Sequence, residues 1–218
     1  MNRKRATNYR YFIAIFLSIV LVLGIIFIVA LKYIVRYSTP VNDTSHVITY
    51  STNKPDENAL DYKFAWKGQP NDPKQVVIES IGAKPYVQKV GVDQNKQVAV
   101  PTNINLVGWF VDSARPGEKG LSLIDGHVSG TRNKGIFKDL DKLNVGDKYS
   151  VILGNGTELT YKVIGKESVK VAASVGVMFS QNPSVSRQLN LVTCSGNYDP
   201  KTRSYDERLI IMSEQIGS

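Results

Sequence analysis

The spacing of hydrophobic and polar positions divides the chain into three regions. Residues 11–31 contain no charged side chain, whereas residues 32–72 are polar, rich in Pro, Asn, Ser and Thr, and without a clear period. From Pro73 onward, short apolar runs alternate with turn residues. This pattern predicts a transmembrane helix, then an extracellular stalk or linker, and then a β-rich domain over residues 73–218.

The β-rich region contains several runs that favour strands and one that favours a helix. Strands are predicted at residues 75–81, 87–92, 98–100, 105–110, 120–124, 148–153, 158–164, 188–193 and 208–212. Residues 154–156, Gly-Asn-Gly, predict a tight hairpin turn. Residues 135–143 predict a short helix. Many short, closely spaced strands indicate a mainly β, predominantly antiparallel sandwich or barrel.

The apolar run near the N-terminus has the length of a membrane anchor. At ~1.5 Å per residue, its roughly 21 residues give a helix of about 31 Å, close to the thickness of a bilayer's hydrocarbon core. A cleaved signal peptide is the alternative, but its apolar region would be only about 7–15 residues long. Four basic residues precede the run and two follow it. The sequence therefore predicts a cytoplasmic basic tail (residues 1–10), an uncleaved single-pass anchor (11–31) and an extracellular domain.

The net charge of +8 reflects this topology more than a binding surface. Six of the 27 Lys and Arg lie at or before Arg36, where none of the 19 Asp and Glu occurs, so the remainder carries 21 − 19 = +2. Nucleic-acid binding is therefore not expected. The residues beyond the anchor suffice for one domain with a core of its own.

Cys194 is the only cysteine, so the chain forms no intramolecular disulfide. An unpaired thiol in an exported domain is unusual unless it is protected or used. A buried core thiol or an intermolecular bridge are the structural alternatives.

Two further residues give Cys194 a chemical context. The strands on either side of the loop SGNYDPKTRSYDE should pair as a hairpin, and a simple hairpin places Arg208 opposite Cys194 unless a bulge intervenes. His127 follows the apolar run LSLID, where a strand end can present it at a rim. Each residue alone is more often structural. Together they supply a thiol nucleophile, an acid or base and a donor to an oxyanion, the minimum set for acyl transfer through a thioester.

These motifs resemble those of sortases, the membrane-anchored cysteine transpeptidases of mainly Gram-positive bacteria. LVTC ending at Cys194 is similar to the TLxTC signature, with Asn190 where the family often has Thr. GHVSG around His127 and YDERLII around Arg208 resemble the histidine and arginine motifs. VGWFVDSARPGEKG and GIFKDLDKLNVGD resemble elements of class D, E and F sortases. The resemblance covers residues 73–216.

The resemblance implies an eight-stranded sortase-type β-barrel with one or two short helices. It also implies a groove that binds an LPxTG-type sorting signal, with Cys194 attacking after the Thr, His127 protonating the Gly amine, and Arg208 holding the substrate and oxyanion. The acceptor would be a peptidoglycan precursor, a pilin lysine or water. Such a thiol protease-like enzyme needs no cofactor, and we expect no metal.

The resemblance extends to substrate-binding residues. Thr193 matches the Thr that precedes the cysteine and would line the groove. Residues 166–187 occupy the place of the loop that recognises Leu-Pro, where Val171, Val177 and Met178 could form a pocket. Ordinary core packing is an equally good reading of these apolar side chains.

Two other functions stay open at this point. One is a different exported cysteine acyl-transferase, such as an L,D-transpeptidase, although the SxGCxR pattern of those enzymes is not matched by the Ser-Gly that follows Cys194. The other is a non-catalytic, membrane-tethered β-barrel that binds a partner. The sequence does not fix the sorting motif, the acceptor or the sortase class, nor whether the stalk lies over the groove.

Overall fold

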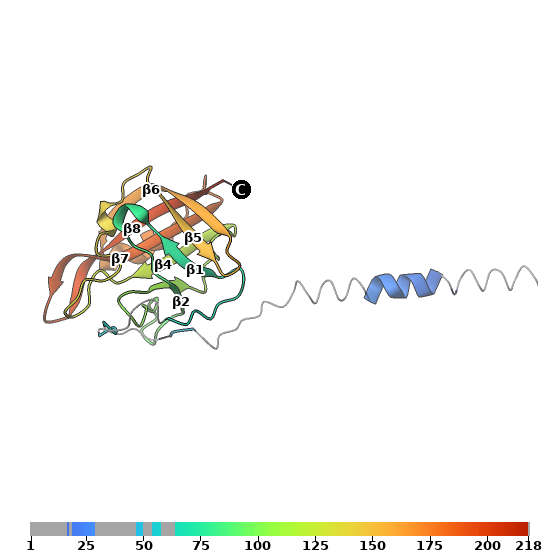
Figure 1. The fold of residues 1–218 in the computed structure, drawn as a ribbon, viewed down its shortest axis with the longest axis horizontal. Helices are drawn as coiled ribbons and strands as arrows, with labels where there is room; N and C mark the ends of the chain where they lie inside the picture. The colour runs from blue at the N-terminus through green and yellow to red at the C-terminus, as the bar shows by residue number, and fades with distance from the viewer. Residues whose placement is uncertain (1–16, 18, 29–46, 50–53, 58–63, 218) are drawn as a thin grey trace, which may run out of the picture. The chain divides into compact units, whose positions relative to one another are not determined.

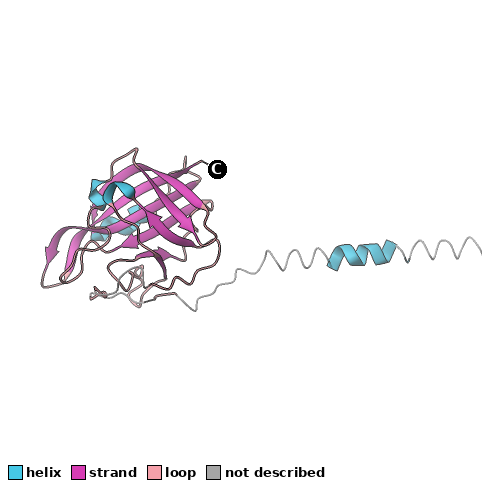
Figure 2. Ribbon diagram, in the orientation of Figure 1, coloured by secondary structure: helices cyan, strands magenta, loops and turns pink. Residues whose placement is uncertain are grey.

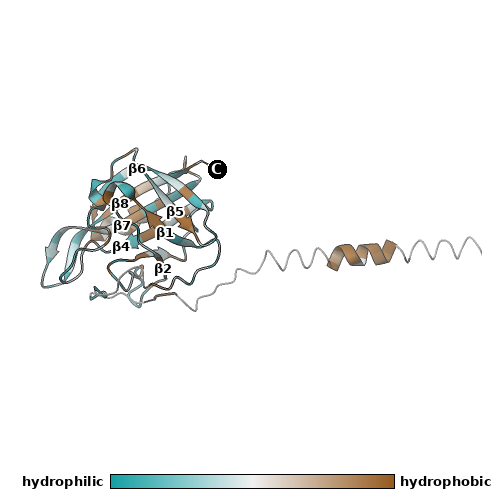
Figure 3. Ribbon diagram, viewed as in Figure 1, coloured by the Kyte–Doolittle hydropathy of each residue, from teal (hydrophilic) through white to brown (hydrophobic). Residues whose placement is uncertain are grey.

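The computed structural model describes residues 17, 19–28, 47–49, 54–57 and 64–217 (Figure 1). Two compact units are present, Met1–Thr44 and Ser45–Ser218. In the first unit, residues 19–28 are helical and hydrophobic (Figure 3). Their large apolar side chains are exposed. No helix within the described residues has the length and apolar character needed to cross a membrane. The predicted span over residues 11–31 falls partly, and the basic tail over 1–10 wholly, outside the described residues.

The second unit is built on one eight-stranded sheet (Figure 2). Its elements are β1 (Pro73–Val77), η3 (Glu79–Ile81), β2 (Val87–Val90), β3 (Val107–Phe110), β4 (Gly120–Gly126), η4 (Leu140–Lys142), β5 (Lys148–Leu153), β6 (Glu158–Lys170), α2 (Val171–Met178), β7 (Arg187–Asp199) and β8 (Ser204–Ile216). The strand order is β1-β5-β6-β8-β7-β4-β3-β2. Most neighbours are antiparallel, whereas β2–β3 and β4–β7 are parallel.

The two outer strands of this order approach one another, so the sheet is a nearly closed barrel. Gln75 of β1 forms an isolated antiparallel bridge with Tyr86, and the amide of Val76 donates to the carbonyl of Pro85 at 3.0 Å. The predicted mainly β, eight-stranded barrel is therefore confirmed. The predicted hairpin turn at residues 154–156 is also confirmed, since β5 and β6 pair on either side of it.

Alternating side chains along the strands build two separate apolar clusters. Inward residues such as Ile124, Leu191 and Ile211 fill the barrel core. Their neighbours on the other face form a smaller cluster, here called the outer cluster, which consists of Val90, Ala99, Phe110, Leu123, Val192 and Ile210. Because successive side chains of a strand point to opposite faces, one stretch of β4, β7 and β8 contributes to both clusters. The outer cluster is the apolar floor of the site described below.

Several predicted elements differ from the structure. Residues 98–100 form no strand; Val98 makes only an isolated bridge, and Ala99 is buried in the outer cluster. The predicted helix at 135–143 is reduced to turns and η4, although its apolar residues are buried in the barrel core. Residues 79–81 form η3 rather than strand. In these connecting segments apolar side chains pack against the barrel core or the outer cluster, and their apolar character alone does not determine the local backbone.

Asp72 joins the two edges that close the barrel. It is 1% exposed, and it accepts a hydrogen bond from the amide of Gln69 at 2.7 Å. Its carboxylate pairs with Lys89 of β2 at 2.9 Å and with Arg115 at 3.0 Å. Burial by itself would raise the pKa of Asp72, but these hydrogen bonds and cations lower it below 3.8. The ionised carboxylate therefore stabilises the fold at neutral pH, and that contribution is lost as the pH falls through the lowered pKa.

We expect Asp72→Ala to lower the free energy of unfolding by about 3 kcal/mol, because it leaves the largely buried Lys89 without its partner and removes one of the two carboxylates that pair with Arg115. Urea unfolding at neutral pH measures the change. Asp112→Ala is the matched control, since Asp112 is exposed. Equal stability of the two variants would contradict this role for Asp72.

Candidate active site

The β7–β8 hairpin places the single thiol beside a guanidinium. Cys194 pairs directly with Arg208, as the hairpin symmetry predicts. The register shifts by one residue between Ser195 and Tyr198, so the pairs nearer the tip follow a different register, in which Leu209 would face Cys194. The bulge therefore brings Arg208 opposite Cys194. The ends of both strands project from the barrel as a hairpin (Figure 1).

His127 reaches the same face from the neighbouring strand. β4 runs parallel to β7 with Asp125 opposite Val192, so the next outward positions, two residues further along each strand, are His127 and Cys194. The hydroxyl of Thr193 donates to the carbonyl of Gly126 at 2.7 Å. This bond joins the end of β4 to β7. Gly126 immediately precedes His127 and Thr193 immediately precedes Cys194, so the bond also fixes the two catalytic candidates relative to each other.

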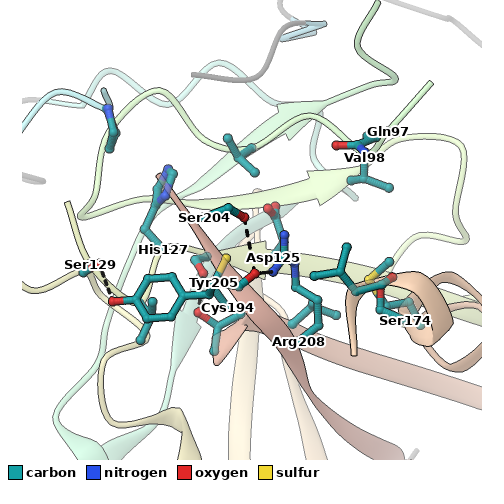
Figure 4. A pocket seen from close by; sticks show the side chains of 18 of the residues that line it. Gln97, Val98, Asp125, His127, Ser129, Ser174, Cys194, Ser204, Tyr205 and Arg208 are labelled. Atoms are coloured by element: carbon teal, nitrogen blue, oxygen red, sulfur yellow. Dashed lines mark hydrogen bonds between the residues drawn. The ribbon is translucent and has the colours of Figure 1, made fainter. Parts of the chain in front are cut away.

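The three side chains meet in a cavity of about 410 Å³ on the outer wall of the barrel. Figure 4 shows Cys194, His127 and Arg208 together there, with Asp125 beside them. Most of the apolar lining comes from three sources: Val171, Val175, Met178 and Phe179 in and after α2, Leu123 and Val192 of the outer cluster, and Val98 and Val100. A mostly apolar lining with a few convergent polar groups is typical of a ligand-binding site.

The imidazole and the thiol are both held in their neutral forms. Burial lowers the pKa of His127 from 6.5, and a hydrogen bond with the carbonyl of Pro101 opposes that shift only in part. Nε2 lies 2.8 Å from this carbonyl oxygen; because the oxygen can only accept, the neutral ring carries its hydrogen on Nε2 and leaves Nδ1 as an acceptor. Burial likewise raises the pKa of Cys194 above 9.0, with Arg208 opposing the shift and Asp125 adding to it.

Arg208 is oriented by its own backbone neighbourhood. Nη1 donates to the carbonyls of Glu207 at 2.9 Å and Tyr205 at 3.2 Å. Within the described part of the chain, Arg208 forms no ion pair with a carboxylate. Its remaining N–H groups are therefore available to an anion or to a peptide carbonyl.

The predicted substrate-binding residues occupy different places. Val171 and Met178 line the cavity. Thr193 borders it but is 3% exposed, and its hydroxyl is already engaged by Gly126. Val177 does not line the cavity and packs against the outer cluster.

The helix that carries the apolar wall was not predicted. Residues 171–178 are rich in valine and contain Gly176, so their intrinsic preference for a helix is weak. Buried polar residues of β7 hold its end instead. The side chain of Asn190, where the sortase signature often has Thr, donates to the carbonyl of Met178 at 2.9 Å. Gln188 donates to the carbonyl of Ser180 at 2.9 Å.

A short piece of the predicted stalk lies against this site. Pro55 is buried and lines the cavity, and the backbone of Asp56 pairs with Asn103. The carboxylate of Glu57 accepts hydrogen bonds from three consecutive amides of the loop after His127, those of residues 131–133. These amides lower the pKa of Glu57, although desolvation opposes them. Residues 54–57 are thereby attached to the rim of the cavity.

We expect Glu57→Gln to loosen this attachment, because a neutral amide with one acceptor oxygen replaces a carboxylate that uses both. Limited proteolysis should then cleave near residues 54–57 faster than in the parent protein. Glu79→Gln is the control, since the Glu79 side chain is exposed and forms an ion pair with Lys84 in the segment after β1. The same cleavage rate in both variants would show that the hydrogen bonds of Glu57 do not hold residues 54–57 at the rim of the cavity.

Comparison with known proteins identifies the family. A model of the sortase domain matches residues 76–216, more than half of the chain, and the chain belongs to the sortase family. No curated protein matches the chain.

Solved structures of sortases share the fold. A sortase D5 transpeptidase of Clostridium perfringens is 25% identical, with a TM-score of 0.50 over 69% of this chain and 83% of that one. Sortase A of Corynebacterium diphtheriae, a lid mutant, is 18% identical, with a TM-score of 0.52 over 70% and 74%. Sortase C1 of Streptococcus agalactiae is 21% identical, with a TM-score of 0.51 over 72% and 73%. These relatives belong to different classes, so they do not assign this chain to class D, E or F.

Proposed function

We propose that this sortase cleaves an LPxTG-type sorting signal and transfers the new acyl group from Cys194 to an amine. The observation that carries the proposal is the convergence of Cys194, His127 and Arg208 in one cavity of a sortase barrel. The family favours this chemistry over an L,D-transpeptidase or a non-catalytic barrel. Each of the three groups supplies what one step of acyl transfer needs.

In the first step, the sulfur of Cys194 attacks the carbonyl carbon of the Thr in the signal. The proton of the thiol passes to His127, whose Nδ1 is free to accept it. The tetrahedral oxyanion forms next to Arg208, which donates hydrogen bonds to it. The C–N bond then breaks, the imidazolium gives its proton to the departing Gly amine, and a thioester remains on Cys194.

In the second step, an amine attacks the thioester, and the thiol returns to its resting form. His127, now neutral, takes a proton from the attacking amine and gives it to the leaving sulfur of Cys194 as the C–S bond breaks. A peptidoglycan precursor or a pilin lysine supplies this amine, and water gives hydrolysis instead. The apolar wall formed by α2 binds the Leu-Pro part of the signal, with Val171, Val175 and Met178 in contact with it.

The apolar N-terminal segment of the sequence also suggests where in the cell the reaction takes place. We propose that the apolar N-terminal segment anchors the enzyme in the cell membrane, with the catalytic unit outside the cell. Sorting-signal proteins and the acceptor would meet the site there.

We expect Arg208→Ala to lower kcat/KM about 10²–10³-fold, the usual effect of losing an oxyanion donor. Arg208→Lys should recover little, because a single ammonium cannot replace a planar fork that is partly fixed by backbone carbonyls. Steady-state peptide cleavage measures both variants, with Arg132→Ala as the control. Full activity of Arg208→Lys would contradict the role of the fork.

The proposed function is tested with the full chain in detergent and a panel of fluorogenic peptides that carry LPxTG, LAxTG and scrambled signals. We expect cleavage after the Thr, and transfer of the product to an added amine. Equal rates on the scrambled peptides, or no cleavage of any of them, would contradict the proposal.

A further inference from the structure

Asp125 is a partly buried acidic group in the catalytic cavity that the mechanism above does not use. It lies in β4 two residues before His127, on the same outward face. Both Asp125 and the three proposed catalytic residues line the cavity, as Figure 4 shows. The carboxyl atom Oδ1 is fully buried and has no hydrogen-bond partner within the described residues. A buried polar atom without a partner is rare in native proteins and calls for a functional explanation.

The barrel wall is shaped to accept this carboxyl. Gly108 of β3 pairs with Asp125, and a side chain at Gly108 would place its Cβ 2.6 Å from Oδ1. Val90 of β2 lies on the other side of the same space, and both of its methyl groups would also contact that Cβ. The carboxyl therefore rests in a slot between a glycine and an apolar side chain, where water cannot easily solvate a charge.

The groups around this slot do not neutralise a charge on Asp125. Gly108 and Val90 carry none, His127 is held neutral, and Cys194 on β7 is a thiol in its resting form. Arg208 on β8 is the only cation facing it, and no ion pair joins the two in the described structure. Burial raises the pKa of Asp125 well above 3.8, although a hydrogen bond from its own amide and the field of Arg208 both act to lower it.

We propose that Asp125 is a peptide-binding residue of this sortase, whose carboxyl group donates a hydrogen bond to a peptide carbonyl of the bound signal. This inference rests on the proposed function. A neutral carboxyl offers one donor, the complement of the C=O of an extended peptide, whereas a carboxylate could only accept. Arg208 stays free for the oxyanion because Asp125 is uncharged.

Peptide binding in a Cys194→Ala background tests the proposal, with fluorescence anisotropy as the measurement. Adding Asp125→Asn should change the dissociation constant by less than about threefold, because an amide also donates and accepts. Adding Asp125→Leu, or Asp125→Ala should the leucine prevent folding, should weaken binding about tenfold or more. If the Leu, Ala and Asn variants all bind as tightly as the Cys194→Ala parent, Asp125 has only a structural role. A loss with Asn as large as the loss with Leu would instead mean that the ionised form binds, and would overturn the proposal.

A second measurement reads the charge of Asp125 without any peptide. The infrared C=O stretch of a protonated carboxylic acid should be present at neutral pH and absent from Asp125→Asn. Absence of the band from the parent protein would overturn the proposal even if peptide binds. Absence of peptide binding by the Cys194→Ala parent would instead contradict the proposed function, and the peptide-binding role with it.

Discussion

Replacing Cys194 by alanine is expected to lower peptide cleavage by about 10⁴-fold or more, because the acyl group then has no atom to which it can be transferred. The loss should appear in kcat, while the affinity for the peptide stays near that of the parent. Steady-state kinetics and peptide binding, measured together, check the two parts.

Ser195→Ala is the matched control, since its hydroxyl bonds to Ser168 and does not line the cavity. Its activity should stay close to that of the parent. Cleavage by Cys194→Ala at a rate comparable with this control would exclude a thiol nucleophile and return Cys194 to the role of a buried core residue.

Replacing His127 by alanine is expected to lower kcat/KM about 10²–10⁴-fold, the usual range for a general acid and base. The variant loses the group that accepts the thiol proton and protonates the leaving amine. Added imidazole should restore part of the activity, because it can enter the space that the side chain leaves. No recovery, together with an unchanged fold, would indicate that His127 positions the loop rather than moving the proton.

The pH dependence of the parent enzyme follows from the same environment. Because burial lowers the pKa of His127, the acid limb of kcat/KM should fall below 6.5, the ordinary value. Because burial raises the pKa of Cys194, alkylation of the thiol should accelerate only above 9.0. The His127→Ala variant should lack the acid limb. If the His127→Ala variant keeps the acid limb of kcat/KM, that limb belongs to another titrating group.

The shifted pKa values of His127 and Cys194 also make the stability of the fold depend on pH. The folded protein resists protonation of His127 more than the unfolded chain does, so this contribution to stability is lost as the pH falls through about 6.5. The folded protein also resists ionisation of Cys194. That contribution is lost as the pH rises through the ordinary value of the thiol.

The cross-strand pairing of Cys194 with Arg208 could be predicted because it depends on the local geometry of one hairpin. The pairs from Gln188 to Ser195 keep the register centred on residue 201, the middle of the loop, which the sequence predicts. The one-residue bulge between Ser195 and Tyr198, which the sequence does not predict, shifts the pairs at the tip relative to them. His127 was predicted to lie at a strand end, and it follows β4 directly. Its approach to Cys194 depends on the parallel pairing of β4 and β7, two strands separated by some 60 residues, which local patterns do not encode.

Asp125 and α2 show what sequence patterns leave out. The period of two already puts Asp125 on the face of His127, but a carboxylate in a strand is normally exposed, and only Gly108 from another strand makes its burial possible. The helix of residues 171–178 has weak propensity and is held by Asn190 and Gln188. Contacts with other strands therefore determine both the burial of the Asp125 carboxyl and the formation of α2.

The most direct test of the central claim is mass spectrometry of the parent enzyme, mixed with an LPxTG-type peptide and quenched in acid. The account predicts an adduct on the peptide that contains Cys194, with the mass of the acyl fragment ending at Thr. It should disappear on adding hydroxylamine and be absent from Cys194→Ala. Cleavage of the signal with no adduct at any time point, or an adduct on another residue, would contradict transfer through a Cys194 thioester.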